Sequence, residues 1–529
     1  MDMPTKTFAT AAQPATYTGN RALAIEEKLI FEIGAPDRSG VDFEEPLSSS
    51  SEAVGQEKPF TSRLGGLERS EPIGLPGLSE PEAVRHYVRL SQKNYSIDTG
   101  IFPLGSCTMK HNPRLNEKMA RLPGLGDIHP LQPQKTVQGA IELMAMLADW
   151  LSRLTGMPAV ALSPKAGAHG ELCGMTAIKA ALEARGEADK RRVVLVPDSA
   201  HGTNPATAAL LGYTIRPVPA RDDGTVSVAA VREALCPEVA AMMLTNPNTC
   251  GLFEPDIAAI AAALHAAGAY LYCDGANFNA IAGRVRPGDL GVDAMHINLH
   301  KTFSTPHGGG GPGAGPVVFS AALAPFAPLP LIREEGGRFV LVEDRAGQGG
   351  EARPFGRLTA FHGQMGMFVR ALAYMLSFGA DGIRQASEDA VLAANYVRAG
   401  LRDVMSQPFG DRPCMHEVLF DDKFLDGTGV STLDFAKAMI DEGFHPMTVY
   451  FPLVVHGAML IEPTESESKA SLDQFTAALR ALALAAQAGE KDRFKGAPHY
   501  APRRRLDETR AARQPVLRFS SASGAGKAG

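Results

Sequence analysis

The sequence predicts an α/β protein with a mainly parallel sheet in its larger part and a smaller α+β domain after it. Between residues 160 and 320, short apolar runs typical of buried strands alternate with segments that carry apolar residues at helical spacing. Strands that alternate with helices are characteristic of a parallel sheet covered by helices. From about residue 357 onward, long helical patterns predominate over short apolar runs. These observations together predict two globular domains.

The composition excludes several classes of protein. The chain has 529 residues, 45% of them hydrophobic, which suffices for a large core and two domains with additional tails. A net charge of -6 indicates no surface suited to nucleic acid. The six cysteines are scattered without a CxxC pair, as is typical of reduced thiols. Neither an apolar signal core nor a membrane-length apolar run is present, so we expect a cytoplasmic protein without a membrane span.

Five segments are expected along the chain. Residues 1–60 are predicted to be a disordered tail, because serine-rich and acidic stretches bury little apolar surface. Order should begin near Pro76, where Ser79 and Glu82 form a capping box before a helix. This helix and a packed, irregular arm at residues 94–110 belong to a segment at 61–133, and the arm could be structural or line a pocket. The large domain is expected at 134–345, the smaller domain at 346–485 and a carboxy-terminal extension at 486–529.

Apolar periodicity places the individual elements. We expect helices at residues 134–155, 172–184, 228–235, 257–267, 365–378 and 386–404. Strands are expected at 160–162, 193–196, 239–245, 269–273, 294–299 and 317–320, with short segments at 418–420 and 458–461 in the smaller domain. Trp150, the only tryptophan, falls on the first helix and is predicted to pack in the core.

Polar side chains follow three of the predicted strands. Asn246 and Asn248 follow strand 239–245, Asp274 follows strand 269–273, and Lys301 follows strand 294–299. Because the carboxyl ends of parallel strands open into one crevice, these side chains are expected to line one pocket. A lone lysine at a strand end is usually a surface cation. A lysine and an aspartate in one pocket, however, are what pyridoxal phosphate chemistry requires: an amine for a Schiff base and an acid for the pyridinium nitrogen.

Two further stretches could hold parts of that cofactor. Gly167 and Ala168 belong to a run of small residues before a helix, where free backbone N–H groups and the helix dipole attract an anion such as a phosphate. Such a run is often only a tight turn. His201 follows strand 193–196 and could stack on a planar cofactor, although a histidine there is often a hydrogen-bonded structural group.

Several motifs in combination resemble one known family. They are the lysine segment at 295–302, FPLGSCTMK at 102–110, LTNPNT at 244–249, YFP at 450–452 and IEPTESES at 461–468. This set is similar to the glycine cleavage system P-protein, and most closely to the half that carries pyridoxal phosphate where the P-protein is split. The resemblance covers about residues 70–515. It implies the aspartate aminotransferase-like fold of pyridoxal phosphate enzymes, called fold type I.

The resemblance also implies roles for individual residues. Lys301 would bind the cofactor covalently, Asp274 would pair with its ring nitrogen, and His201 would stack on its ring. Asn277 would contact the phenolic oxygen, near which either Asn246 or Asn248 would add a polar contact. The residues implied for the phosphate are Gly167, Ala168 and His300.

The activity implied is decarboxylation of glycine, with the pyridoxal 5'-phosphate ring as electron sink. The aminomethyl group would pass to the lipoyl arm of a carrier, the H-protein. A nicotinamide is not required, and no GxGxxG follows a strand; the glycines at 308–311 are expected to form a mobile loop over the site. Since this chain resembles one half of the long P-protein, it should require P-protein subunit 1, as an α2β2 heterotetramer.

Three alternatives differ in class. One is another fold type I pyridoxal phosphate enzyme, such as a transaminase or cysteine desulfurase, which the pocket residues alone would allow. A second is a metal hydrolase that uses His296, His300 and His307; on a strand, however, the first two rings would lie about 13 Å apart, too far for one ion. The third is a non-catalytic partner subunit.

Overall fold

The computed structural model describes residues 27–35, 38–40, 65–67, 69–70, 74–308, 313–344, 352–501 and 503–518. The chain divides into two compact units, one made of Met1–Tyr95 with Gly496–Gly529 and the other of Ser96–Lys495. The five-segment division predicted above is finer than this and stays a prediction. Among the described residues, none of the helices combines the length and the apolar composition needed to cross a membrane.

The first unit contains helices α2 (Ile30–Ile33), α4 (Glu80–Gln92) and α16 (Glu508–Arg513). The predicted capping box is confirmed, since the carboxylate of Glu82 accepts a hydrogen bond from the Ser79 N–H at 3.0 Å. Helix α2 lies inside the range predicted to be disordered, so the prediction is wrong for these residues. The chain is held there because Glu27, just before α2, accepts hydrogen bonds from Arg89 of α4 at 2.6 and 2.7 Å. Residues 1–26 and 41–60 lie outside the described part.

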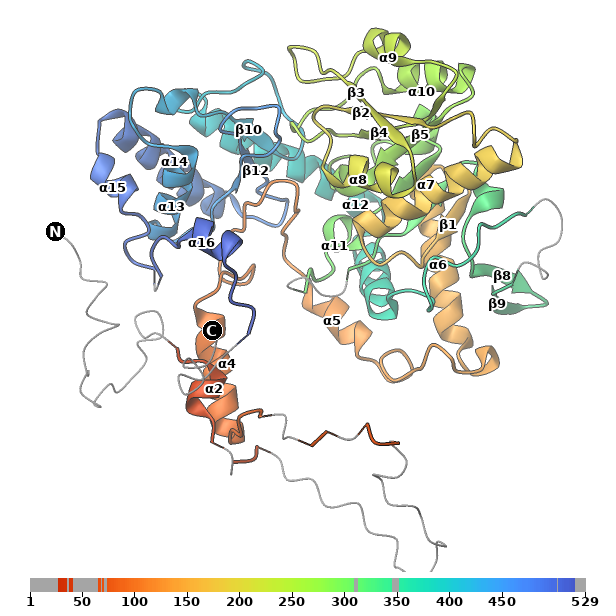
Figure 1. Cartoon of the computed structure of the whole chain (residues 1–529), viewed down its shortest axis with the longest axis horizontal. Coiled ribbons are helices and arrows are strands. Elements are labelled where there is room, and N and C mark those ends of the chain that lie inside the picture. Colours follow the sequence, from red (N-terminus) through yellow and green to blue (C-terminus); the bar gives the residue numbers. More distant parts are fainter. Residues whose placement is uncertain are drawn as a thin grey trace, which may run out of the picture. The chain divides into compact units, whose positions relative to one another are not determined.

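The second unit is built on a seven-stranded sheet with strand order β1-β7-β6-β5-β4-β2-β3 (Figure 1). Strand β7 runs antiparallel to both of its neighbours, and the other neighbouring pairs are parallel. The prediction of a mainly parallel sheet is therefore confirmed. The strands are β1 (Ala159–Ala161), β2 (Val193–Pro197), β3 (Thr214–Val218), β4 (Val239–Thr245), β5 (Tyr270–Asp274), β6 (Ala294–His296) and β7 (Val317–Phe319).

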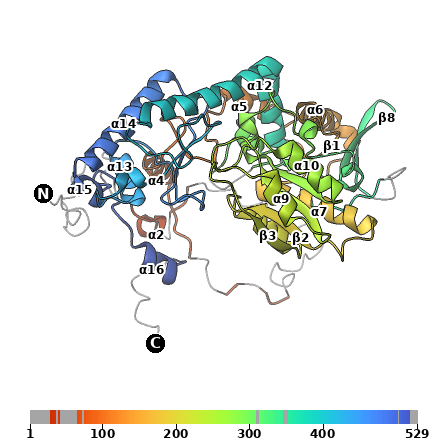
Figure 2. The same cartoon turned by 90° about the horizontal axis from the view of Figure 1, so that it is seen from above.

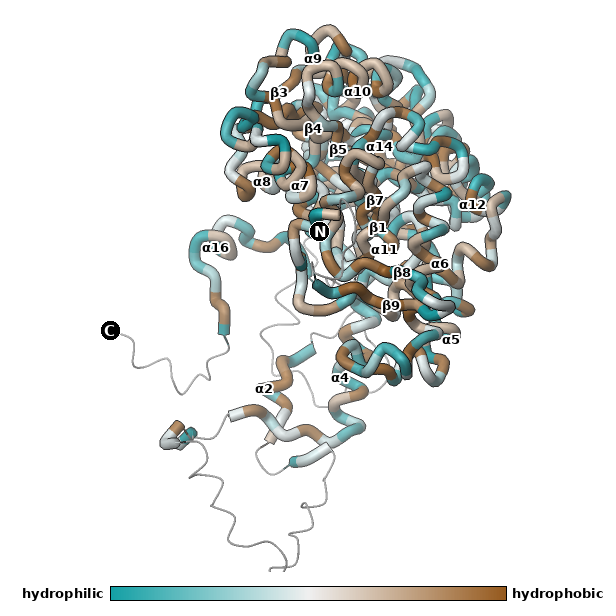
Figure 3. Tube along the Cα trace, turned by 90° about the vertical axis from the view of Figure 1, so that its right-hand side faces the viewer, coloured by the Kyte–Doolittle hydropathy of each residue, from teal (hydrophilic) through white to brown (hydrophobic). Residues whose placement is uncertain are grey.

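Helices pack on both faces of this sheet. Helices α7 (Gly167–Ala184) and α8 (Thr203–Leu210) share one apolar core with the strands, and α6 (Gln138–Thr155), α9 (Val228–Ala234) and α10 (Ile257–Ala266) share the other. Successive residues of β4 alternate between the two cores: Met243 faces α7, and Met242 and Leu244 face the opposite side. In Figure 3 brown marks hydrophobic residues, and it recurs along these strands. Trp150 packs against the second core, as predicted.

The smaller part of this unit has a three-stranded antiparallel sheet, in the order β10-β12-β11. Its elements are α12 (Met365–Leu401), β10 (Val418–Phe420), α13 (Thr432–Asp441), β11 (Thr448–Val449), β12 (Met459–Ile461), α14 (Lys469–Gln487) and α15 (Lys491–Lys495). Helix α12 lies beside α14 (Figure 2). The two helices predicted at 365–378 and 386–404 are confirmed, because α12 is broken by a kink at Gly379, although the second helix begins earlier than predicted. The chain passes Gly379 at φ 64° without a loop, because glycine tolerates the left-handed region and the second helix begins at once.

Short elements complete the described unit: α5 (Arg114–Ala120), α11 (Leu299–Thr302), β8 (Leu331–Glu335), β9 (Arg338–Val342) and the 3-10 helices η1 (Gln134–Thr136), η2 (Gly275–Ala280), η3 (Pro287–Leu290), η4 (Ala324–Phe326) and η5 (Lys423–Leu425). One of them corrects a central prediction. The strand predicted at 294–299 ends at His296, and Lys301 lies on the helical turn α11. The apolar alternation continues past the strand because Ile297, which follows β6, and Leu299, the first residue of α11, are both buried.

Candidate active site around Lys301

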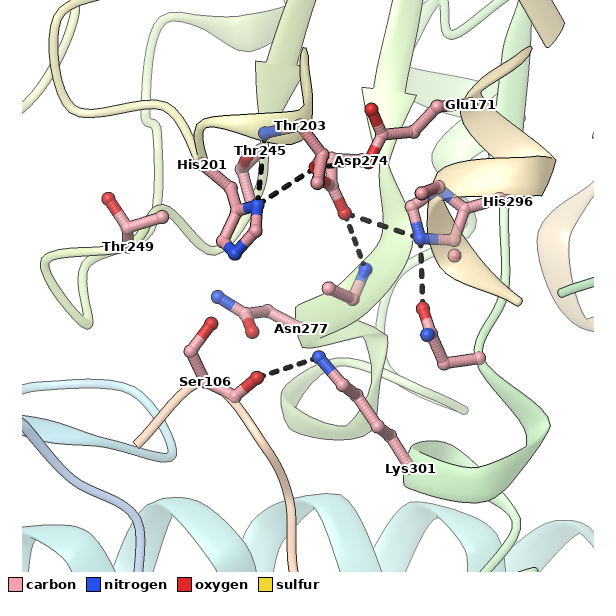
Figure 4. Close-up of a pocket in the computed structure, with 14 residues that line it drawn as sticks. Ser106, Glu171, His201, Thr203, Thr245, Thr249, Asp274, Asn277, His296 and Lys301 are labelled. Atoms are coloured by element: carbon pink, nitrogen blue, oxygen red, sulfur yellow. Dashed lines mark hydrogen bonds and ion pairs between the residues drawn. The ribbon is translucent and has the colours of Figure 1, made fainter. Parts of the chain in front are cut away.

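A cavity of about 170 Å³ opens at the carboxyl ends of β2, β4 and β5 (Figure 4). Six of the residues predicted from the sequence line it: Lys301, Asp274, His201, Asn277, Gly167 and Ala168. They come from four separate stretches of the sequence, and the shared edge of the sheet brings them together.

Lys301 enters the cavity from α11. Its amine Nζ donates a hydrogen bond to the backbone oxygen of Ser106 at 2.7 Å, drawn as a dashed line in Figure 4. Ser106 belongs to the irregular arm predicted at 94–110 and also lines the cavity. The arm therefore contributes to the pocket through its backbone.

Asp274 is the last residue of β5 and is only 3% exposed. Its Oδ2 accepts a hydrogen bond from Asn204 Nδ2 at 2.9 Å, and its Oδ1 accepts one from the Ala276 N–H at 2.9 Å. Burial alone would raise the pKa of Asp274, but nearby His296 and these hydrogen bonds outweigh burial and hold the pKa below its ordinary value. Asp274 is therefore a buried anion at neutral pH. Burial lowers the pKa of His296, and the charge of Asp274 opposes this effect.

Glu171, on the first turns of α7, also lines the cavity and was not assigned a role from the sequence. Burial and the charge of Asp274 raise its pKa to about 7. Its carboxylate accepts hydrogen bonds from the hydroxyls of Thr203 at 2.6 Å and Thr207 at 3.2 Å. A carboxylate among small residues at the start of a helix was the available signal, but its partners lie more than thirty positions away.

The ring of His201 lies in the wall of the cavity, where Nδ1 pairs with the Thr203 hydroxyl at 2.8 Å. This contact orients the ring. Asn277 is 1% exposed and donates through Nδ2 to the Pro247 oxygen at 3.0 Å, while its buried Oδ1 has no partner among the described residues. An orphaned polar atom in a cavity wall is typical of a ligand site.

The helix predicted to start at residue 172 begins at Gly167, so Gly167 and Ala168 form its first turn. A Cβ added at Gly167 would lie 3.0 Å from Asn298 Nδ2, which explains why the residue is small. The first residues of an 18-residue helix thus lie in the wall of the cavity, and the first N–H groups of a helix have no partner within it. The two residues therefore belong to a helix amino terminus and not to the tight turn that was the alternative, and their role toward a phosphate stays a prediction.

His300 lies beside the cavity but does not line it. Its Nε2 pairs with Asn298 Nδ2 at 3.1 Å, and its buried Nδ1 has no partner among the described residues. Burial lowers the pKa of His300 to about 3, so the ring is neutral. The expected glycine loop falls largely on residues 309–312, which lie outside the described part.

Asn246 and Asn248 do not line the cavity, contrary to the prediction. The loop after β4 folds on itself: Asn246 Oδ1 accepts from the Glu254 N–H at 3.0 Å, and Asn248 Nδ2 donates to Glu254 Oε1 at 2.7 Å. The residues that β4 and its loop present to the cavity are instead Thr245 and Thr249.

The arrangement of the histidines does not favour the metal alternative. His300 lies on a helical turn, so the distance predicted for a strand does not apply. Asn298 Oδ1 pairs with His296 Nε2 at 2.8 Å, so this amide lies between the His296 and His300 rings. Within the described residues, His296, His300 and His307 do not form a group with converging ligand atoms.

Comparisons with known proteins agree with this geometry. The family model "Glycine dehydrogenase, C-terminal domain" matches residues 386–499, and "Aminotransferase class-V" matches residues 170–312. A solved glycine decarboxylase (P-protein) of the glycine cleavage system, in inhibitor-bound form, is similar with a TM-score of 0.67 at 21% identity, over 80% of this chain and 95% of that one. A cysteine desulfurase from Escherichia coli is similar with a TM-score of 0.54 at 16% identity, over 74% and 96%. These structures show that the fold is that of fold type I, as predicted.

Curated relatives share far more of the sequence. A probable glycine dehydrogenase (decarboxylating) subunit 2 from Caulobacter vibrioides is 67% identical over 510 residues, which is 96% of this chain and 95% of the relative. A protein of the same name from Desulforamulus reducens is 48% identical over 493 residues, 93% of this chain and 99% of the relative. The chain therefore belongs to the family of glycine dehydrogenase (decarboxylating) subunit 2.

Proposed function

We propose that this chain decarboxylates glycine with pyridoxal 5'-phosphate bound at Lys301, and that the aminomethyl group passes to the lipoyl arm of the H-protein. One observation carries the proposal: Lys301 and the buried anion Asp274 share one cavity with His201 and a helix amino terminus. The substrate is taken from the names of the relatives. When bound, the cofactor would supply an electron sink for the bond that breaks at the glycine Cα.

The residues present fit this cofactor. The first turn of α7, at Gly167 and Ala168, would hold the phosphate through backbone N–H groups and the helix dipole. His201 would stack on the ring, and Asn277 would contact the phenolic oxygen. His300 would act beside the phosphate through its neighbour Asn298.

Asp274 would hold a proton on the ring nitrogen. The carboxylate is buried and its pKa is lowered, so it stays ionised and requires a cation next to it. A protonated ring nitrogen at Asp274 would remove this cost and make the ring a stronger acceptor of electrons.

The partners are inferred from the family. The relatives are named subunit 2, which implies a subunit 1. We infer an α2β2 heterotetramer with that subunit, a lipoylated H-protein as acceptor, and a cytoplasmic location. All six cysteines are free thiols, as reducing conditions would require.

The test is exchange of labelled bicarbonate into glycine, with H-protein and with or without subunit 1. We expect exchange by the two subunits together, and its loss in Lys301→Ala. Lys135→Ala, at an exposed lysine of the same unit, is the matched control. Absence of exchange in every combination would refute the glycine assignment. If the protein instead released sulfur from cysteine or transferred the amino group of an amino acid, another reaction of this fold would be favoured.

A further inference from the structure

The arm that touches Lys301 is held in an unusual backbone conformation. Ser106 and Thr108 have φ values of 66° and 49°, in the left-handed region that is unfavourable for residues with a side chain. The preceding Gly105 donates its N–H to the Leu460 oxygen at 3.2 Å, and a Cβ there would lie 2.3 Å from Leu460 Cγ. The arm is thus pressed against β12 and bent by two strained residues.

Two buried carboxylates hold the bent arm. Glu417 Oε2 accepts a hydrogen bond from the Ser106 N–H at 2.7 Å. Glu462 accepts one from the Thr108 N–H at 2.8 Å and one from the Thr108 hydroxyl at 2.5 Å. Both glutamates are fully buried. They come from adjacent strand ends, because Glu417 precedes β10 and Glu462 follows β12, where Val418 pairs with Ile461.

Burying the carboxyl groups of Glu417 and Glu462 side by side costs free energy of folding, so stability alone does not explain this pair. Burial, and then the charge of Glu462, raise the pKa of Glu417 well above its ordinary value. Burial also raises the pKa of Glu462, to about 7. The nearby Lys301 acts in the opposite direction and lowers the pKa of both glutamates. The pair and the lysine are therefore coupled electrostatically as well as through the arm.

A metal site is the competing reading, because His416, Glu417 and Glu462 present ligand atoms within 4.8 Å of one another. The carboxylate oxygens, however, already accept hydrogen bonds. Both oxygens of Glu462 face Thr108, and those of Glu417 face the Ser106 N–H and, at 3.4 Å, Asn277 Nδ2. Because protein donors already bind these oxygens, the cluster is better suited to holding the arm than to binding a metal ion.

We propose that Glu417 and Glu462 are positioning residues for Lys301. They hold the strained arm so that the Ser106 carbonyl oxygen faces the amine and keeps it aimed into the cavity. The inference rests on Lys301 as the cofactor-binding amine of the proposed function, but not on glycine as the substrate.

The test measures Lys301 directly in protein freed of cofactor. The variants are Glu417→Gln and Glu462→Gln, with Glu117→Gln as matched control, because Glu117 lies in the same unit and pairs with Arg370 instead. The rate at which trinitrobenzenesulfonate labels Lys301 is followed against pH by peptide mass spectrometry. We expect the labelling midpoint to move to lower pH by about one unit, a tenfold change in proton affinity, because the Ser106 carbonyl oxygen is no longer held as a fixed acceptor for the amine.

Two milder substitutions at Thr108 provide a control in case the glutamate variants misfold. Thr108→Ala removes only the hydroxyl that contacts Glu462, and Thr108→Ser restores one. We expect a smaller shift of the labelling midpoint in Thr108→Ala than in the glutamate variants. In Thr108→Ser the midpoint should return to the wild-type value. Wild-type midpoints in the glutamate and Thr108→Ala variants would overturn the proposal. Because neither glycine nor H-protein is present, this result is independent of the exchange assay, which tests the function itself.

Discussion

The buried ion pair of Lys110 and Glu465 allows a quantitative prediction. Lys110 Nζ donates to Glu465 Oε1 at 2.6 Å, to Asn279 Oδ1 at 2.8 Å and to the Thr302 oxygen at 2.9 Å. The two charged side chains are only 2% and 9% exposed. Burial would lower the pKa of Lys110, but Glu465 more than offsets this effect and raises it, so the lysine stays charged.

Lys110→Met should lower the free energy of unfolding by about 3–5 kcal/mol, since it leaves Glu465 as a buried charge without its partner. In Lys110→Met/Glu465→Met no charge remains, and the cost should fall to about 2 kcal/mol, because the acceptors on Asn279 and Thr302 lose a donor and Asn279 Nδ2 loses its acceptor on Glu465. Urea unfolding can be followed by the fluorescence of Trp150, the only tryptophan, which packs against the core of this unit.

The matched control is Lys469→Met, which breaks an exposed pair with Asp473 at 2.8 Å. Exposed pairs contribute little, so its unfolding midpoint should not change measurably. The reasoning is refuted if Lys110→Met behaves like this control, or if the double variant loses as much stability as the two single variants combined. Because Thr302 follows Lys301 directly, the double variant should regain stability without regaining full bicarbonate exchange.

Three further predictions concern the cavity and the first unit. Lys301→Ala should abolish the visible absorption band of the lysine-bound cofactor, and an unchanged band would place the cofactor elsewhere. Asp274→Asn should retain cofactor but lose about 10²–10³ in exchange rate, because an amide does not stabilise the ring cation; a wild-type rate would contradict this. Hydrogen bonds from Arg89 lower the pKa of Glu27 to about 2, so its contribution to stability is complete above pH 4.5 and is lost as the pH falls toward 2. Amide exchange of α4 should accelerate over that range in wild type but not in Glu27→Gln.

Buried strands were the most predictable part of the fold. Strand β4 has the bounds 239–245 that its apolar run predicted, because all seven of its residues are buried and the run ends where polar residues begin. Asp274 was found for the same reason: it is the first polar residue after an apolar strand. A long apolar run indicates where a strand ends, and in a parallel sheet the end of a strand is where ligands bind.

Short turns after the strands could not be predicted in this way. The segment at 295–301 alternates like a strand, yet Lys301 lies on a helical turn of four residues. Asn246 and Asn248 turn away from the cavity because Glu254, itself buried, offers them partners. Polarity at the end of a strand therefore predicted the position of the site but not which side chains enter it.

The contacts of the arm show why the rest of the site is hidden from sequence patterns. Ser106 and Glu417 are 311 positions apart, and Thr108 and Glu462 are 354 apart. Propensity and periodicity describe neighbours within one element, and neither assigns two non-glycine residues to the left-handed region. Strain of this kind persists only where surrounding contacts impose it. The oxygen that Lys301 contacts is thus set by carboxylates on a different sheet, so substitutions at the end of β12 should alter the lysine without touching it.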